Sequence, residues 1–237
     1  MDTMDNRTDK KTQPPLPSRA TRVVPRRSKA STRGAIIASP PGAEGCERII
    51  QFESKLEQRV LFLLLARSDL WDIWEQPPAI AYTAPDGRTQ KHTFDFLATF
   101  ATGYRWAVVV KPQERAARPG FKEKLAAIRM ELRKSFADEL RLITDADFTR
   151  DEALNAERLH RFRRNLTPEA VAHAHDRLAS ADFPADIATL VQHLDMGGDG
   201  FQAILVGIYD GRLVADTRSE INETTRVDLV PDVEAQA

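Results

Sequence analysis

Residues 92–112, HTFDFLATFATGYRWAVVVKP, constrain the fold of this chain more than any other stretch. Two runs of aromatic and β-branched residues are joined by Thr102-Gly103-Tyr104, which predicts two short strands connected by a turn. The second run, Trp106 to Val110, is apolar throughout and then ends on Lys111, directly before a proline. Two charges therefore stand out in an apolar segment, Asp95 in the first strand and Lys111 at the end of the second.

The elements around this segment predict an α/β unit. Between residues 53 and 67 the apolar positions recur at helical spacing, and Glu53 and Glu57 lie four residues apart on one face of that helix. A hairpin is expected around Pro85-Asp86-Gly87, a helix over residues 121–132 and a strand at residues 139–144. The order helix, hairpin, strand, helix, strand is typical of a mixed sheet with helices packed on it, in a unit of about 100 residues.

The pattern becomes helical after Thr144. Three helices are expected, opened by Thr149, Thr167 and Asp182, and the Thr-Pro-Glu start of the second is typical of an N-cap with proline at the first helical position. A further helix, a break at Gly211 and two short strands follow, which together suggest a winged-helix-like module. We therefore expect an α/β domain at residues 44–145 and a helical, winged-helix-like domain at residues 146–237 that ends in a disordered tail.

Charge is distributed unevenly along the chain. The net charge is −1, yet between Lys10 and Ala43 there are basic residues and no acidic one. Rich in Pro, Ser and Thr, residues 1–43 are expected to form a disordered basic arm and linker, serving either as a solubilising tail or as a DNA contact. The basic residues expected to touch DNA are Arg19, Arg22, Arg26, Arg27, Lys29 and Arg33.

Composition excludes some classes of protein. Apolar residues make up 42% of the chain, enough for a packed core, and no apolar run approaches the length of a membrane span. We expect a soluble, intracellular protein in the cytoplasm. A single cysteine, Cys46, excludes an internal disulfide framework and a cysteine-based zinc site.

A metal-dependent DNA nuclease needs carboxylates to hold Mg²⁺ beside the scissile phosphate and a lysine to stabilise the attacking hydroxide or the developing charge. Glu57 on its helix, Asp95 on its strand and Lys111 are candidates for these roles. Each also has a structural interpretation: Glu57 on a solvated helix face, Asp95 in an ion pair at a strand end, for which Lys111 is the candidate partner, and Lys111 as a simple strand exit.

An ordered series of motifs resembles the amino-terminal domain of TnsA, the endonuclease subunit of Tn7-like heteromeric transposases. The series comprises an arginine-rich lead with Arg-Gly, then ESKLE, EQP, TFDF and a strand ending in VVVKP, over roughly residues 20–145. The resemblance implies a restriction-endonuclease-like fold with Glu57 and Asp95 as metal-binding acids and Lys111 as the strand lysine. Cofactor and partners implied by it are Mg²⁺ (or Mn²⁺), double-stranded DNA, a DDE-type transposase and an ATPase regulator.

The chain departs from that family at two positions. Val109 stands where the family has Glu or Gln in an acid-x-Lys pair, and valine can neither bind a metal nor orient a water. Phe94 replaces the proline of TPDF. A carboxylate from the next helix, Glu114 or Glu123, would be needed to replace the missing group.

The resemblance therefore leaves the activity open. One alternative is an Mg²⁺-dependent endonuclease that cuts the 5′ strands at transposon ends. The other is a DNA-binding or scaffold protein that keeps the nuclease fold without its chemistry, with a winged-helix regulator as a weaker third reading.

Two other groups of residues have ordinary structural interpretations. The histidines at positions 160, 173, 175 and 193 lack metal-site spacing and are expected on the surface. The arginines at positions 158, 161, 163 and 164 either contact phosphate or complement the C-terminal end of a helix.

Overall fold

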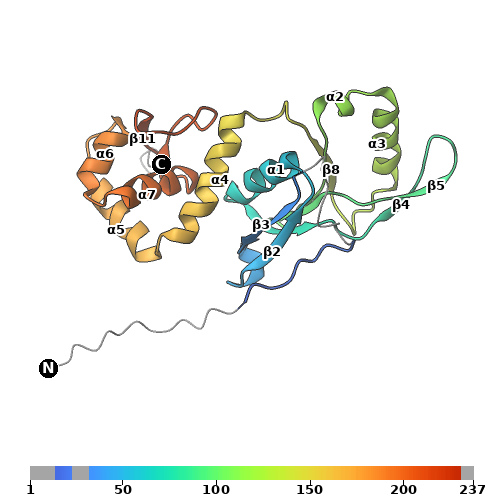
Figure 1. The fold of residues 1–237 in the computed structure, drawn as a ribbon, viewed down its shortest axis with the longest axis horizontal. Coiled ribbons are helices and arrows are strands. Elements are labelled where there is room, and N and C mark those ends of the chain that lie inside the picture. The colour runs from blue at the N-terminus through green and yellow to red at the C-terminus, as the bar shows by residue number, and fades with distance from the viewer. Residues whose placement is uncertain (1–13, 23–31, 231–237) are drawn as a thin grey trace, which may run out of the picture.

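The computed structural model describes residues 14–22 and 32–230. At its centre lies a four-stranded mixed sheet with the order β3-β6-β7-β8 (Figure 1). Its strands are β3 (Leu70–Glu75), β6 (Phe96–Phe100), β7 (Arg105–Val110) and β8 (Glu139–Ile143). The first three pair antiparallel, and β8 joins β7 in parallel. The two strands expected around Thr102-Gly103-Tyr104 are thus β6 and β7, and the expected mixed sheet is confirmed.

Strand β7 is buried on both faces. Val108 and Val110 pack in one apolar cluster with side chains of α1 (Lys55–Ala66), whereas Ala107 and Val109 pack in a second cluster with Ile128 of α3 (Pro119–Glu131). Successive strand residues point to opposite faces, so an uninterrupted apolar run suits a strand with a helix on each side.

Two hairpins flank the sheet. Strands β4 (Ile80–Thr83) and β5 (Thr89–His92) pair around the expected Pro85-Asp86-Gly87 turn, where Gly87 has a φ of +80°, and Figure 1 shows this hairpin extending from the body. A short helix, α2 (Gln113–Ala116), follows β7.

The second hairpin was not expected. β1 (Gly34–Ala38) pairs with β2 (Arg48–Phe52), with the 3-10 turn η1 (Pro41–Ala43) between them. The prediction of a disordered arm and linker is therefore wrong for residues 34–43. Residues 1–13 and 23–31 of that expected arm lie outside the described part, as do residues 231–237 of the expected tail.

The carboxy-terminal part begins with α4 (Arg150–Asn165) and α5 (Pro168–Leu178). Thr149 and Thr167 cap them as expected, Thr149 in a reciprocal capping box with Glu152. The third helix starts later than predicted: Asp186, not Asp182, accepts a hydrogen bond from Thr189 N and caps α6 (Ile187–Leu194). The remaining elements are β9 (Ala185–Asp186), α7 (Gly198–Tyr209), β10 (Leu213–Val214) and β11 (Arg226–Leu229), with the three strands in the antiparallel order β10-β11-β9.

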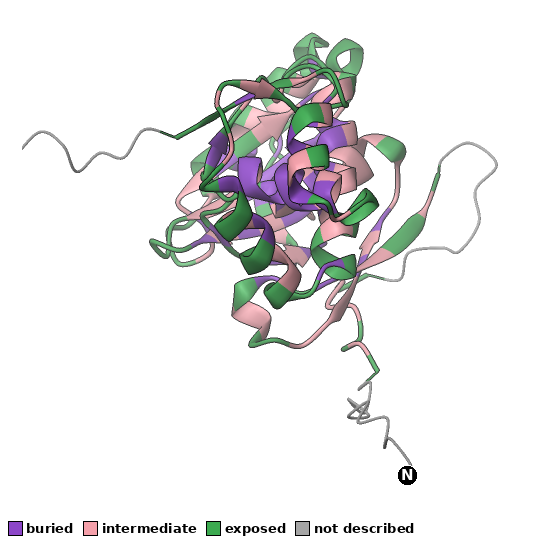
Figure 2. Ribbon diagram, turned by 90° about the vertical axis from the view of Figure 1, so that its left-hand side faces the viewer, coloured by how far each residue is buried: buried purple, intermediate pink, exposed green. Residues whose placement is uncertain are grey.

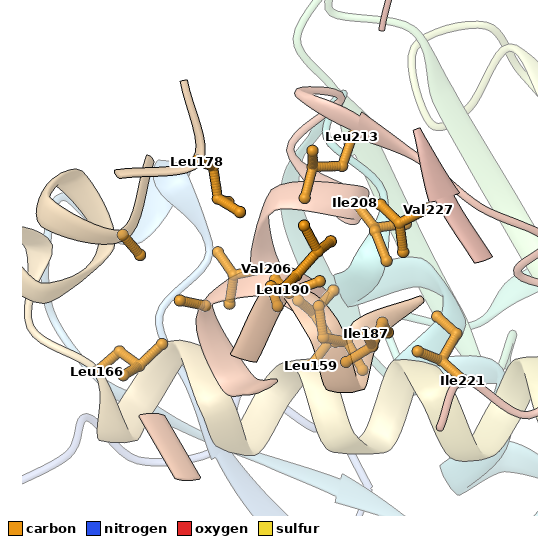
Figure 3. Close-up of a cluster of buried hydrophobic side chains, with 14 of the residues drawn as sticks. Leu159, Leu166, Leu178, Ile187, Leu190, Val206, Ile208, Leu213, Ile221 and Val227 are labelled. Atoms are coloured by element: carbon orange, nitrogen blue, oxygen red, sulfur yellow. The ribbon is translucent and has the colours of Figure 1, made fainter. Parts of the chain in front are cut away.

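Helix α4 joins the two halves of the molecule. Its Leu159 lies in the apolar cluster of the carboxy-terminal helices, drawn in Figure 3, and that cluster also takes in Phe62 and Ala66 of α1. Figure 2 shows buried segments continuing through the middle of the molecule beneath an exposed surface. In the described ranges, no helix combines the length and apolar character needed to cross a membrane.

Asn155 is the buried polar link between α4 and the loop before β11. Its amide donates to the carbonyl oxygens of Thr217 (3.2 Å) and Ser219 (2.8 Å), and its Oδ1 accepts from Ile221 N at 3.0 Å. The side chain is fully buried, so the loop depends on it to satisfy three backbone groups.

We expect Asn155→Ala to lower the free energy of unfolding by about 2–4 kcal/mol, because it leaves three backbone groups of the loop without their partner. The measurement is chemical denaturation beside Asn165→Ala, an exposed asparagine at the end of the same helix whose loss should cost under about 0.5 kcal/mol. Equal losses in the two variants would contradict the role given to Asn155.

Candidate active site

Glu57 lies in the first turn of α1 and is held there by hydrogen bonds. Ser54 caps the helix by accepting from Glu57 N at 3.1 Å, while the Glu57 carboxylate accepts from Glu53 N at 2.6 Å and from Ser54 Oγ at 3.0 Å. This is a variant of the capping box in which the carboxylate reaches back one residue further. The side chain is therefore fixed and partly buried, not on a freely solvated face.

Asp95 lies where β6 begins, between the ends of two neighbouring strands. Its backbone extends the sheet, since Asp95 N donates to Val108 O and Asp95 O accepts from Gln76 N, both at 2.9 Å. Its side-chain Oδ2 accepts from Val110 N at 2.7 Å. Main-chain and side-chain bonds together fix the carboxylate beside the end of β7.

Lys111 follows the last residue of β7 and remains tied to the sheet, donating its backbone N–H to Ile143 O at 3.1 Å. Burial raises the pKa of both Glu57 and Asp95, and the side-chain charge of Lys111 opposes that rise at each of them. The structure thus brings Glu57, Asp95 and Lys111 into one electrostatic neighbourhood.

The two carboxyl groups are crowded and poorly solvated. Burial, and then the negative charge of Glu57, raise the pKa of Asp95 to about 7, against the lowering effects of the Val110 N–H, Lys111 and Arg22. Burial also raises the pKa of Glu57 above its ordinary value, although its hydrogen bonds to Glu53 N and Ser54 oppose the change. Two adjacent acids that resist ionisation form a site where a cation would be stabilised.

These donors fit a divalent cation in part. Carboxylate oxygens are the ligands that Mg²⁺ and Mn²⁺ prefer, and Glu57 and Asp95 supply two such groups. Within the described residues, however, no cluster of three acidic, histidine or cysteine side chains is arranged to hold a metal ion. At position 109, where the resemblance implies Glu or Gln, the chain has a valine.

Val109 is 1% exposed and packs among apolar side chains that include Phe94 and Tyr82. Both departures from the TnsA pattern, at positions 94 and 109, therefore lie in one packed cluster. The replacements considered for position 109 do not point to the site: Glu114 forms an exposed ion pair with Arg118 at 3.5 Å, and Glu123 is exposed on α3.

Two basic residues assigned to the arm are bound to the folded body. Arg19 forms a bidentate pair with Asp72, both contacts at 2.9 Å, and donates to Ile73 O at 2.6 Å. Arg22 pairs with Glu53 at 2.6 Å and donates from Nε to Gln76 Oε1 at 2.9 Å. Arg19 is thus a structural residue, and Arg33 is partly buried ahead of β1. The positions of Arg26, Arg27 and Lys29 lie outside the described ranges.

The EQP motif, residues 75–77, holds residues 18–22 against the folded body. The Glu75 carboxylate accepts from Ser18 Oγ at 2.5 Å and from Arg19 N at 3.0 Å, and Gln76 O accepts from Thr21 N at 3.0 Å. We call residues 18–22 the strap. Sequence reasoning noticed EQP as a landmark but had no signal for what Glu75 and Gln76 bind.

Sequence reasoning also passed over His92, at the end of β5. Its ring packs edge-on against Phe94, with centroids 4.9 Å apart, and its pKa falls to about 4 because it is buried and faces Lys124 and Lys111. A neutral imidazole therefore lies within the electrostatic reach of Lys111.

The arginines of α4 are paired with acids. Their partners are Glu220 for Arg158, Glu157 for Arg161, Asp210 for Arg163 and Glu47 for Arg164. These pairings make α4 a weak candidate for a phosphate-binding surface.

Comparison with known proteins gives one match. Residues 68–145 match the sequence model of a family described as TnsA-like endonuclease N terminal. The match spans β3 to β8 and includes Asp95, Val109 and Lys111, whereas Glu57 lies before it. No curated protein matches the chain. Residues 68–145, which form the central sheet, are therefore similar to a TnsA-like endonuclease N-terminal domain.

Proposed function

We propose that this chain is a TnsA-type DNA endonuclease with a reduced metal site, which cuts the 5′ strands at transposon ends. The observation that carries the proposal is the joint placement of Glu57, Asp95 and Lys111 at the end of β7, with the charges of Glu57 and Lys111 acting on the Asp95 carboxyl group. A DDE-type transposase and an ATPase regulator are the partners proposed from the resemblance.

Each residue has a distinct part in this proposal. Glu57 and Asp95 would hold Mg²⁺ or Mn²⁺, which supplies charge stabilisation at the scissile phosphate and a more acidic bound water. Asp95 is kept in place by the Val110 N–H, and Glu57 by Ser54 and the Glu53 N–H. Lys111 would place its ammonium group beside the same phosphate and stabilise the charge that develops during strand cleavage.

Val109 favours a second candidate function, a DNA-binding or scaffold protein that has lost cleavage. A buried valine packed with Phe94 leaves no water-filled space at position 109 for a ligand side chain. This candidate shares the fold, the DNA and the proposed protein partners with the first, and differs only in the chemical step.

We also propose that the carboxy-terminal part is a winged-helix-like module. The support is its order α5, β9, α6, α7, β10, β11 and its sheet order β10-β11-β9, in which the last two strands form a hairpin beside the first. In the proposal this module docks a partner protein.

The nuclease proposal predicts that the protein nicks labelled duplex DNA in the presence of Mg²⁺ or Mn²⁺, either alone or together with the proposed DDE-type transposase. Asp95→Ala, Glu57→Gln and Lys111→Ala should each lower the rate by about 10²–10³ or more, because each removes a charge aimed at the reacting phosphate. Glu114→Gln, which changes an exposed acid, is the control and should cut at the wild-type rate. Absence of nicking under all these conditions would leave the non-catalytic candidate.

The raised pKa of Asp95 predicts a pH-dependent stability. Between 3.8, the ordinary value, and about 7 the unfolded chain releases this proton while the folded protein keeps it, so stability falls as pH rises through that window. Asp95→Asn stays neutral and should be more stable than the wild type above pH 7, by about 1–3 kcal/mol in a chelating buffer. The difference should shrink as the pH falls below 7.

Denaturation at several pH values, with and without Mn²⁺, measures this effect. Mn²⁺ should stabilise the wild type above pH 7 but not Asp95→Asn, because the ion binds the ionised carboxylate. Asp86→Asn, in the exposed turn between β4 and β5, should follow the wild type at every pH. A pH-independent gap between Asp95→Asn and the wild type would contradict the raised pKa.

The packing of Val109 predicts that the family residue is costly here. Val109→Gln would place an amide among Phe94, Tyr82 and Ile128, and we expect the free energy of unfolding to fall by about 1–3 kcal/mol. Val214→Gln, at an exposed position of β10, is the matched control and should change little. A stable Val109→Gln variant would mean that the cluster has room for a polar ligand.

A further inference from the structure

The strap carries Arg22 directly to the two strand ends that surround the candidate site. Thr21 donates both N–H and Oγ1–H to Gln76 O, at 3.0 Å each, which fixes the residue before Arg22. The next link is the Gln76 N–H, which bonds to Asp95 O at 2.9 Å. Gln76 is therefore hydrogen-bonded both to Arg22 and to the catalytic candidate Asp95. In Figure 1 the strap belongs to the dark blue segment that runs along the body of the molecule.

The Arg22 guanidinium is held in a defined orientation. Its Nε donates to Gln76 Oε1 at 2.9 Å, and its terminal nitrogen pairs with Glu53 Oε1 at 2.6 Å. The Glu53 N–H in turn donates to the Glu57 carboxylate at 2.6 Å. The arginine thus contacts neighbours of both acids, through Gln76 on the Asp95 side and through Glu53 on the Glu57 side.

This guanidinium is also accessible. The Arg22 side chain is 52% exposed, against 28% for Arg19, whose guanidinium is used on Asp72 and Ile73. Arginine offers five N–H donors in a planar fork suited to phosphate, and the two named contacts of Arg22 use only its Nε and one terminal nitrogen. A half-exposed, oriented fork beside two carboxylates is suited to a phosphate that approaches a bound cation.

We propose that Arg22 is a phosphate-positioning residue of the nuclease site. When DNA binds, the Arg22 guanidinium leaves Glu53 and contacts the DNA backbone beside Glu57 and Asp95. This inference rests on the proposed DNA-processing function but needs no cleavage. Glu53 acts as the resting partner of the guanidinium, and the strap sets its position.

The proposal explains how DNA can approach an acidic site. Glu53, Glu57 and Asp95 repel a phosphate, and an arginine already fixed among them offsets part of that repulsion without ordering a flexible side chain on binding. An arginine in a freely moving arm would strengthen binding but would not place a phosphate at one point.

Fluorescence anisotropy with duplex DNA in EDTA tests the proposal on the full-length chain, since EDTA separates binding from cleavage. Arg22→Gln should weaken binding about three- to tenfold and reduce the slope of log K against log salt by about 0.9, the value for one phosphate contact. Arg22→Lys should keep that slope because it keeps the charge. Arg67→Gln is the matched control, a half-exposed arginine paired with Asp69 just after the opposite end of α1.

A double-mutant cycle with Glu53→Gln tests the exchange of partners. Glu53→Gln should tighten DNA binding several-fold in the wild type by releasing the guanidinium, and should have a smaller effect in the Arg22→Gln background. If thermal unfolding shows that Arg22→Gln folds poorly, Glu53→Gln alone tests the proposal through the expected tightening of DNA binding. Unchanged affinity and slope in a folded Arg22→Gln variant, or strict additivity in the cycle, would overturn the proposal.

Two further outcomes separate this inference from the proposed nuclease function. If Arg22→Gln weakens DNA binding and the wild-type protein nicks no DNA, the result supports the positioning role and contradicts only the proposed cleavage. Tighter Mn²⁺ binding by Arg22→Gln with unaltered DNA binding would instead identify Arg22 as an internal counter-ion and overturn the phosphate contact.

Discussion

The burial of β7 on both faces is the constraint on which the candidate site depends. Because Ala107 to Val110 face apolar clusters above and below the sheet, placing a charge at any of these four positions would cost much free energy. Charged groups can only occupy its end, where Lys111 leaves the sheet and the Val110 N–H is available to Asp95. The position of the chemistry thus follows from where the apolar core stops.

The same constraint applies to position 109, where the resemblance to TnsA implies Glu or Gln. A polar residue at position 109 needs a neighbour small enough to admit water or a cation, and the Phe94 ring lies in the same cluster as Val109. Phe94 also packs against His92 and Phe136, so the aromatic side chain is part of a larger contact. Positions 94 and 109 therefore belong to one apolar packing unit.

The sequence predicted those elements whose signal is local. Helix α1, the β4–β5 hairpin and the β6–β7 pair follow from periodicity and turn residues, and Asp95 and Lys111 attracted notice because charge is rare in an apolar strand. The β1–β2 hairpin was missed because its short strands lie next to Pro- and Gly-rich residues that indicate a linker. Arg19 and Arg22 were assigned to a disordered arm for a different reason: a count of charges cannot reveal that Asp72 and Glu53, distant in sequence, will pair with them.

The strap changes what counts as the nuclease unit. A domain defined from residue 44, or by the family match that starts at residue 68, omits the segment that covers Glu75 and Gln76. Glu75 is fully buried, and its carboxylate takes the Ser18 hydroxyl and the Arg19 N–H as hydrogen-bond donors. Without the strap this carboxylate would lose both of these hydrogen-bond donors. The EQP motif and the strap therefore form one structural unit, and because Gln76 N also donates to Asp95 O, that unit helps to set the position of Asp95 in the candidate site.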